Sequence, residues 1–139
     1  MAVPPQNSQQ ASVVSPYLTV RDVDAAVKFY QKAFQFIPTQ ITPGKDGTSE
    51  HAEMEYKNHL IMAGKEGAWE SLLKSPRTSG VDSPITLCVY CDDVDQFYTA
   101  ALSNGAKSIS APEDMFWGDR MCRLQDPDNY TWCFLTPVA

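Results

Sequence analysis

The sequence predicts an α+β fold built from two tandem βαβββ modules. The order of one strand, one helix and three strands occurs twice, and the motif Asp22-Val23-Asp24 of the first half returns as Asp93-Val94-Asp95 in the second. Each copy of the motif lies between a strand-like segment and an amphipathic helix. Because one such unit cannot cover both faces of its sheet, we expect the pair to form one curved mixed sheet, with helices on the outer face and a concave cleft on the other.

The length and charge of the chain limit its organisation and partners. With 139 residues, of which 43% are hydrophobic, the chain fits one globular domain. The net charge of −6 argues against nucleic acid and anionic membrane surfaces as partners. A bilayer-spanning run and a secretory signal are both missing from the sequence, so we expect a cytoplasmic protein. The predicted organisation is a flexible N-terminal tail (1–12) and one domain (13–136), comprising module one (about 13–64), a connector (65–83) and module two (84–136).

Module one is predicted from residue periodicity. Residues 13–20 are rich in β-branched and aromatic side chains, which is typical of a strand. Asp22 is then a helix N-cap, because a single apolar stripe follows it at Val23, Ala26, Val27, Tyr30, Ala33 and Phe34. Three further strands are predicted at 36–42, 50–56 and 59–63. A turn at Pro43–Gly47 separates the first two, and a tight hairpin at Lys57-Asn58 separates the last two.

Module two repeats the pattern after a Pro-, Gly- and Ser-containing connector. The connector allows one short helix at 69–73. A strand at 84–91 precedes Asp93, a second N-cap, and the helix after it ends at Asn104-Gly105. Strands are predicted at 107–110, 120–124 and 130–135, and the residue types of Asp126–Asn129 suit a type I turn between the last two. Residues 111–120 are expected to be a loop.

Four cysteines could suggest zinc or disulfides. Cys88 and Cys91 have the C-x-x-C spacing, but they lie in a predicted strand, where positions three apart point to opposite faces. Their sulfur atoms should therefore diverge. We interpret all four cysteines, Cys88, Cys91, Cys122 and Cys133, as reduced and structural.

Several motifs resemble one known family. The stretch Val20–Tyr30, within a paired βαβββ pattern, resembles the vicinal oxygen chelate superfamily, which includes glyoxalase I, extradiol dioxygenases, and fosfomycin resistance and bleomycin-binding proteins. Phe116–Arg120, Asp126–Trp132 and His51–Met54 resemble its PhnB-like, bleomycin-resistance-like branch. The resemblance covers about residues 13–136. It implies a homodimer whose second subunit completes or walls the clefts, and the connector offers an apolar cluster of Trp69, Leu72 and Leu73 for such a contact.

The resemblance also implies where a metal would be bound. The four positions that hold His or Glu in the metal enzymes of the superfamily are occupied here by Ser15, Met62, Thr86 and Cys133. These side chains are poor ligands for a divalent transition ion, so we expect neither a metal nor another cofactor. A displaced metal site at His51, Glu53 and Glu55, or an acid–base pair of the two glutamates, is the alternative.

Strand alternation predicts what the cleft presents instead. Tyr17 and Tyr90 fall on the face opposite the aliphatic residues of their strands, so the concave face should carry tyrosines and hydroxyls. We expect this face to bind or sequester a small aromatic molecule, with a lyase, isomerase or dioxygenase as the alternative. Trp117 could instead fill the core, Arg120 could form an ion pair with Asp119, and the two tyrosines could fill a closed barrel mouth. The expected ligand-binding residues are Ser15, Tyr17, His51, Thr86, Tyr90, Phe116, Trp117, Arg120 and Cys133.

Overall fold

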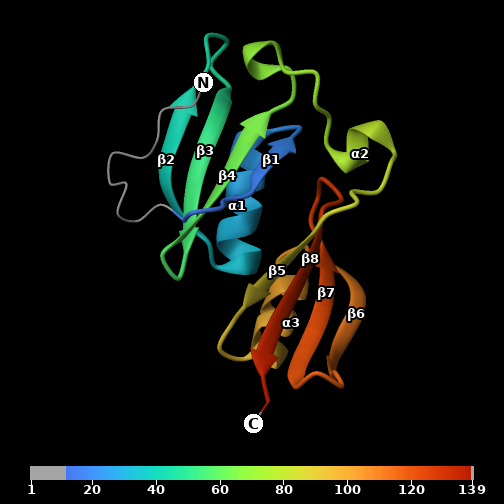
Figure 1. The fold of residues 1–139 in the computed structure, drawn as a ribbon. Helices are drawn as coiled ribbons and strands as arrows, with labels where there is room; N and C mark the ends of the chain where they lie inside the picture. Colours follow the sequence, from blue (N-terminus) through green and yellow to red (C-terminus); the bar gives the residue numbers. More distant parts are fainter. Residues whose placement is uncertain (1–11, 139) are drawn as a thin grey trace.

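The computed structural model describes residues 12–138 (Figure 1). The expected tail lies outside the described residues except for Ser12, whose hydroxyl accepts a hydrogen bond from the Leu60 amide at 3.0 Å. Along the chain the elements are β1 (Tyr17–Val20), α1 (Val23–Phe34), β2 (Ile37–Pro43), β3 (Ser49–Tyr56), β4 (His59–Lys65), the 3₁₀ turn η2 (Ala68–Glu70), α2 (Pro76–Ser79), β5 (Thr86–Tyr90), α3 (Val94–Ser103), β6 (Lys107–Asp114), β7 (Asp119–Gln125) and β8 (Thr131–Pro137).

The strands form two four-stranded mixed sheets, ordered β1-β4-β3-β2 and β5-β8-β7-β6. In each sheet the first strand of the module pairs in parallel with the last, and the remaining pairs are antiparallel. The α+β class and the tandem βαβββ modules are confirmed. The single continuous sheet is not seen: β1 and β5 are both edge strands, and among residues 12–138 no ladder joins them. Each module forms a separate four-stranded sheet, so side chains rather than strand pairing join the two sheets.

Both long helices begin as the sequence predicts. The Asp22 carboxylate accepts a hydrogen bond from the Ala25 amide at 3.0 Å, and that of Asp93 accepts one from the Gln96 amide at 3.2 Å. In Figure 1, α1 lies behind the first sheet and α3 behind the second. None of the helices in residues 12–138 has the length and apolar character needed to cross a membrane.

The core lies where the helices and the inner faces of the sheets meet. Phe34 at the end of α1 packs against Phe134 of β8 with ring centroids 4.8 Å apart, and Phe97 of α3 packs on the same ring at 4.1 Å. Leu18 and Val20 of β1 belong to this core, which confirms the predicted inward face of that strand. Because the same cluster contains residues of both modules, the two halves bury their apolar surface together.

Several boundaries differ from the sequence prediction. β1 begins at Tyr17 rather than at residue 13, and the connector holds η2 and the short α2 rather than one helix at 69–73. β6 continues to Asp114 through part of the expected loop, and it can include Pro112 because it is an edge strand. All four cysteines are free; Cys91 is buried in the core and Cys88 is exposed, so these two side chains do diverge.

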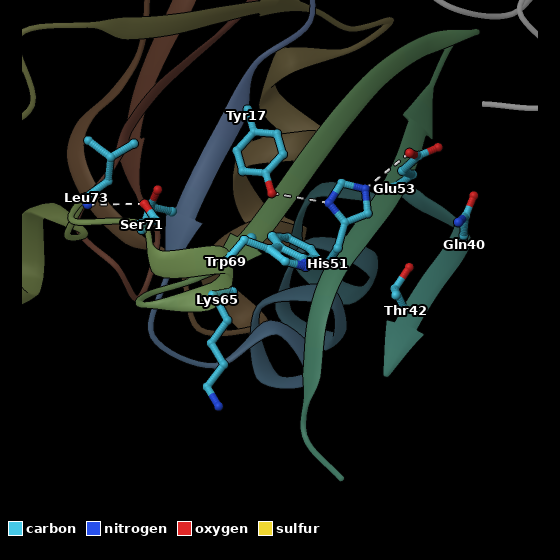
Figure 2. A pocket seen from close by; sticks show the side chains of 12 residues that line it. Tyr17, Gln40, Thr42, His51, Glu53, Lys65, Trp69, Ser71 and Leu73 are labelled. Atoms are coloured by element: carbon cyan, nitrogen blue, oxygen red, sulfur yellow. Dashed lines mark hydrogen bonds and ion pairs between the residues drawn. The ribbon is translucent and has the colours of Figure 1, made fainter. Parts of the chain in front are cut away.

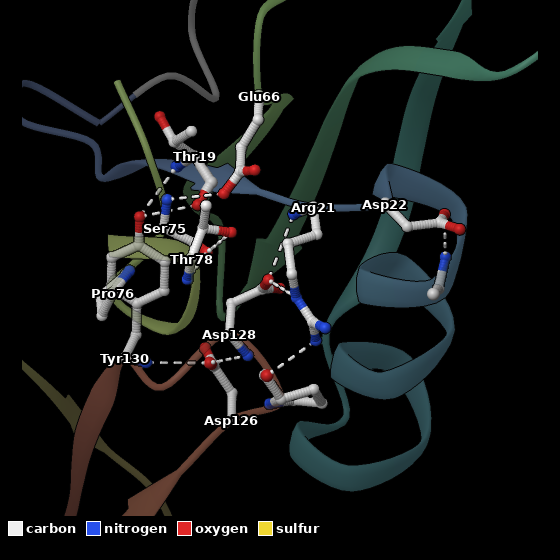
Figure 3. A network of polar contacts seen from close by, with 12 residues as sticks. Thr19, Arg21, Asp22, Glu66, Ser75, Pro76, Thr78, Asp126, Asp128 and Tyr130 are labelled. Carbon is white, nitrogen blue, oxygen red and sulfur yellow. Dashed lines mark hydrogen bonds and ion pairs between the residues drawn. The ribbon is translucent and has the colours of Figure 1, made fainter. Parts of the chain in front are cut away.

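A polar network fastens the turn after β7 to module one (Figure 3). The buried Asp126 carboxylate accepts hydrogen bonds from the Tyr30 hydroxyl at 2.5 Å and the Trp132 indole at 2.9 Å. Asp128 accepts one from the Arg21 guanidinium at 2.9 Å. The Tyr130 hydroxyl donates to the carbonyl of Thr19 at 2.8 Å and accepts from its amide at 3.1 Å. The end of β1 is therefore held in place by module two.

Candidate functional site

A cavity of about 560 Å³ opens on the face of the first sheet that points away from α1. Its floor is formed by β1, β4, β3 and β2, and its wall by the connector after β4 (Figure 2). Strand register arranges the floor in two rows, one of Thr19, Gly64, His51 and Thr42, and the next of Tyr17, Met62, Glu53 and Gln40. The polar side chains of three strands therefore converge on one space.

A buried imidazole and carboxylate form the centre of the floor. His51 is 5% exposed and Glu53 is 3% exposed, and the His51 Nε2 atom lies 3.1 Å from a Glu53 carboxylate oxygen. The His51 Nδ1 atom lies 3.3 Å from the Tyr17 hydroxyl (Figure 2). An ionised Glu53 can only accept, so it assigns the imidazole proton to Nε2 and leaves Nδ1 to accept the Tyr17 proton. Burial raises the pKa of Tyr17, which keeps its hydroxyl protonated near neutral pH.

Two aromatic rings shape the cavity. Tyr17 packs beside His51, with ring centroids 5.6 Å apart. Trp69 reaches over the cavity from η2, with its ring edge-on to His51 at 6.1 Å. Trp69 is 61% exposed and adopts a φ of 51°, a left-handed backbone conformation that costs free energy for a bulky residue. The connector thus holds a large ring partly in solvent above polar groups.

The charge at the rim is neutralised. The Lys65 ammonium donates to Asp46 at 3.2 Å and to the Thr48 hydroxyl at 2.8 Å. Hydrogen bonds from Thr48, with a further one from Lys65, lower the pKa of Asp46 to about 2, so this partner is ionised at neutral pH. The Glu53 carboxylate has a hydrogen-bond partner in His51, and Lys65 has an ionic partner in Asp46, so both groups are already engaged. Such a cavity suits an uncharged organic molecule better than an ion.

The other expected ligand-binding residues lie on the second sheet. The Tyr90 hydroxyl and the Trp117 indole both donate to one oxygen of the buried Asp119 at 2.8 Å. Trp117 is 48% exposed and Phe116 is 98% exposed, so neither fills the core. Tyr90 also lines a second cavity, of about 480 Å³, between β5 and the hairpin that joins β3 and β4. Within one chain, Tyr17 and Tyr90 therefore do not share a cleft.

Arg120 lies on the helix side of β7. Its guanidinium donates to Asp95 at the start of α3 at 2.9 Å and to Asp114 at 3.2 Å. These carboxylates raise the pKa of Arg120. An ion pair is thus present, although its partners are Asp95 and Asp114 rather than Asp119. Alternation along β7 explains the difference, because neighbouring residues project from opposite faces of the sheet.

The four positions of the expected metal ligands do not converge within one chain. Met62 lies in the first sheet, whereas Thr86 and Cys133 are register partners of Thr131 and Cys88 in the second. Ser15 precedes β1, and its buried hydroxyl has no hydrogen-bond partner among the described residues. No cluster of three His, Cys, Asp or Glu side chains suited to a metal occurs in residues 12–138, so His51, Glu53 and Glu55 do not form one.

Comparison with known proteins identifies the family. The family model described as the Glyoxalase/Bleomycin resistance protein/Dioxygenase superfamily matches residues 10–134. The chain belongs to this superfamily. It is 34% identical over 126 residues to "Uncharacterized protein Mb0911c" of Mycobacterium bovis, covering 90% of this chain and 83% of that protein. It is also 34% identical over 126 residues to "Uncharacterized protein Rv0887c" of Mycobacterium tuberculosis, covering 90% of this chain and 74% of that protein.

Solved structures of the superfamily share the fold. TioX from Micromonospora sp. ML1 superimposes with a TM-score of 0.74 at 23% identity, over 91% of this chain and 99% of that chain. A superfamily enzyme from Burkholderia phytofirmans PsJN superimposes with a TM-score of 0.69 at 18% identity, over 89% of this chain and 97% of that one. At these identities the likeness establishes the two-module glyoxalase-type fold alone.

Sequence reasoning did not find the whole cavity. It predicted Tyr17 and His51 as ligand-binding residues, and the structure brings them together. It missed Gln40 and Thr42, and it assigned Trp69 to a dimer contact. The alternation of β2 could have suggested the first two residues. Trp69 had no periodic signal, because its position depends on a turn at Gly67 with φ of 81°.

Proposed function

We propose that this glyoxalase-superfamily protein binds, and thereby sequesters, a small planar organic molecule in the cavity of its first sheet, without a metal ion in that cavity. The observation that carries the proposal is the 560 Å³ cavity in which Tyr17 and Trp69 flank the paired His51 and Glu53. Its volume falls within the roughly 300–1,000 Å³ of sites for small organic ligands. An aromatic ligand stacking on Tyr17 or Trp69 would gain about 0.5–1.5 kcal/mol per ring beyond the burial of its area.

The hydrogen-bonding pattern favours a ligand that carries a donor. With the His51 proton on Nε2, the Tyr17 hydroxyl donates a hydrogen bond to His51, and the lone pairs of its oxygen can accept a hydrogen bond from the ligand. Gln40 and Thr42 line the opposite side of the floor and can both donate and accept. An uncharged heteroaromatic with an N–H or O–H group fits this arrangement.

The test uses nuclear magnetic resonance on the full ¹⁵N-labelled chain. Indole, phenol and quinoxaline represent planar probes with and without a donor group. We expect indole or phenol to shift the amide signals of Thr19, Gly64 and Trp69 more than quinoxaline does. Trp69→Ala should weaken this binding about tenfold, on the basis of a lost stacking contribution of about 1.5 kcal/mol. Shifts confined to the second sheet, or equal binding by Trp69→Ala, would contradict the proposal.

A homodimer is part of the proposal. The connector exposes Trp69, Leu72 and Leu73, and the face of the second sheet exposes Tyr90 and Trp117. Large apolar groups gathered in this way commonly mark protein contacts. A second copy that places its second sheet over the cavity of the first would unite the two groups of expected ligand-binding residues. In that assembly Trp117→Ala weakens probe binding together with Trp69→Ala, whereas in a one-chain site only Trp69→Ala does so.

Acid–base catalysis by a lyase or isomerase is the second candidate function. The observation that favours it is the relay from the Tyr17 hydroxyl through His51 to the buried Glu53. In such a relay His51 takes a proton from a carbon next to a carbonyl, and the Glu53 carboxylate stabilises the imidazolium that forms. The protein should then exchange the α-hydrogen of a bound ketone with D2O, and Glu53→Gln should abolish this exchange. A ligand that binds without exchange contradicts the enzymatic alternative.

We also propose that the protein is cytoplasmic. This location is supported by the four cysteines, which the structure leaves as free thiols. Unpaired thiols of this number are typical of reducing compartments. Fractionation of cells that produce the full chain tests the location, and recovery in a secreted or membrane fraction would contradict it.

A further inference from the structure

Two cysteines lie side by side on the face of the second sheet that points away from α3. β5 and β8 are parallel neighbours, and Cys88 is the direct register partner of Cys133. The residues that flank them in sequence pack on the helix side of the sheet, in or against the core: Leu87, Val89, Trp132 and Phe134. By strand alternation both thiols therefore project from the opposite face. Both are free; Cys88 is exposed and Cys133 is buried.

Burial and a nearby guanidinium act in opposite directions on the Cys133 thiol. Burial raises the pKa of the Cys133 thiol, and the neighbouring Cys88 raises it further. Arg123 of β7, the register partner of Cys133 on its other side, opposes this and lowers the same pKa. The Cys133 thiol is therefore protonated near neutral pH, and a metal ion that binds it must displace the proton.

Two thioethers lie next to the thiols. Met121 of β7 belongs to the same small buried cluster as Cys133, and Met115 packs against that cluster. The face therefore combines two thiols and two thioethers, all of them soft ligands. Thiolate and thioether sulfur together select Cu(I), whereas zinc seldom uses thioether ligands.

The spacing of the strands favours a bridging ion over a disulfide. Neighbouring strands lie about 4.7–4.9 Å apart. A disulfide needs Cβ atoms about 3.5–4.5 Å apart, so directly paired residues of flat parallel strands are too far from each other. Two thiolates bound to one ion at about 2.3 Å each are farther apart than the roughly 2 Å of a disulfide, so an ion can join a pair of thiols that a disulfide cannot.

We propose that Cys88 and Cys133, with Met121 as a third ligand, form a binding site for Cu(I). Binding releases the two thiol protons to solvent and leaves the thioether neutral, so no electron is transferred and no covalent bond of the protein is broken. The site lies on the second sheet and uses none of the residues that form the cavity of the first. In the proposed dimer the same face covers the partner's cavity, so the copper titration is carried out without organic probes.

The test is an anaerobic titration of the reduced full chain with Cu(I), in competition with bicinchoninate, whose copper complex is coloured. We expect the wild-type chain to remove one Cu(I) per chain from the dye. Cys88→Ala should weaken binding at least about 100-fold, and Met121→Leu, which conserves volume, about tenfold. Cys88 is exposed, so its substitution does not endanger the fold. Cys122→Ala is the matched control, because that thiol is buried on the helix side, and it should retain affinity within about twofold.

Three results would overturn the proposal. The first is equal copper uptake by Cys88→Ala, and the second is an equal loss in Cys122→Ala; both would place the copper elsewhere. The third is an internal Cys88–Cys133 disulfide that forms readily in air in a chain that binds no Cu(I). X-ray absorption of the copper-loaded chain adds a direct check. A shell of sulfur at about 2.3 Å supports the site, and a shell of nitrogen or oxygen alone contradicts it.

Discussion

The phenol ring of Tyr17 occupies the space that a side chain on Gly64 of the neighbouring strand β4 would fill. A Cβ atom on residue 64 would lie 2.7 Å from Cε1 and 2.9 Å from Cζ of the ring, closer than real Cβ atoms approach other atoms. Any side chain at residue 64 would therefore require the Tyr17 ring to move. The missing side chain of Gly64 lets the Tyr17 hydroxyl reach His51 across the floor of the cavity.

Gly64→Ala should displace the Tyr17 ring. Because the new methyl group cannot occupy the space of the ring, we expect a loss of about 1–3 kcal/mol in the free energy of unfolding, as for other overpacked sites. The displaced hydroxyl should also break its contact with His51. Urea unfolding measures the first effect, and the His51 ring signals in an NMR spectrum report the second.

A double-variant cycle provides the control for this substitution. In a Tyr17→Ser background the methyl group of Gly64→Ala meets no ring, so its cost should fall below about 0.5 kcal/mol. An equal cost in both backgrounds would mean that strand β4 itself, and not the Tyr17 ring, requires glycine at this position.

Tyr130→Phe should loosen the end of β1. The variant removes the hydroxyl that bonds both the amide and the carbonyl of Thr19, and we expect a loss of about 1–3 kcal/mol. Hydrogen exchange at the Thr19 amide should accelerate. Tyr98→Phe is the matched control, since its hydroxyl contacts only the exposed Ser108 hydroxyl and should cost less than about 0.5 kcal/mol. Unchanged exchange at Thr19 in Tyr130→Phe would contradict the role assigned to this contact.

The contribution of Asp126 to the free energy of unfolding should fall as pH rises, which is the opposite of the usual behaviour of a carboxylate. Burial raises the pKa of Asp126, although its hydrogen bonds with Tyr30 and Trp132 oppose the shift. A raised folded-state pKa contributes stability below the unfolded-state value of about 3.9 and loses it as pH rises through the folded-state value. The difference in unfolding free energy between wild type and Asp126→Asn should therefore shrink as pH rises from about 3 toward neutrality. Urea unfolding at a series of pH values measures it.

Asp46→Asn provides a control of opposite sign. The pKa of Asp46 is lowered to about 2, so its contribution is present above the unfolded-state value and is lost as pH falls through about 2. The difference between wild type and Asp46→Asn should thus grow as pH rises from about 2 to about 4. If the differences in unfolding free energy for Asp126→Asn and Asp46→Asn change in the same direction with pH, burial does not set the pKa of Asp126.

Sedimentation should reveal a homodimer. Leu72 is 91% exposed and Leu73 is 65% exposed, and covering them would remove apolar area from water. At micromolar concentration we expect a species of twice 15.5 kDa. Leu72→Lys should shift it toward the monomer, whereas Leu102→Lys on the partly exposed face of α3 should not. A 15.5 kDa species alone, at all concentrations tested, would contradict the dimer.

Local chemistry made the elements predictable from the sequence. The caps Asp22 and Asp93 sit at the helix starts because a side-chain oxygen satisfies amides that no helical carbonyl can reach. The inward face of β1 followed from the alternation of Leu18 and Val20 with polar neighbours. The hairpin turn at Lys57-Asn58 was also predictable from the sequence, and both residues adopt the positive φ of such a turn.

The tertiary structure alone decided which residues meet. Alternation gives the face on which Tyr17 and Tyr90 lie, but it cannot say that their strands belong to separate sheets, because that depends on how Phe34, Phe97 and Phe134 pack across the modules. These contacts join residues far apart in the chain, and no periodic pattern encodes them. For the same reason the pairing of Cys88 with Cys133, and of Tyr17 with Gly64, became visible only once the strands lay side by side.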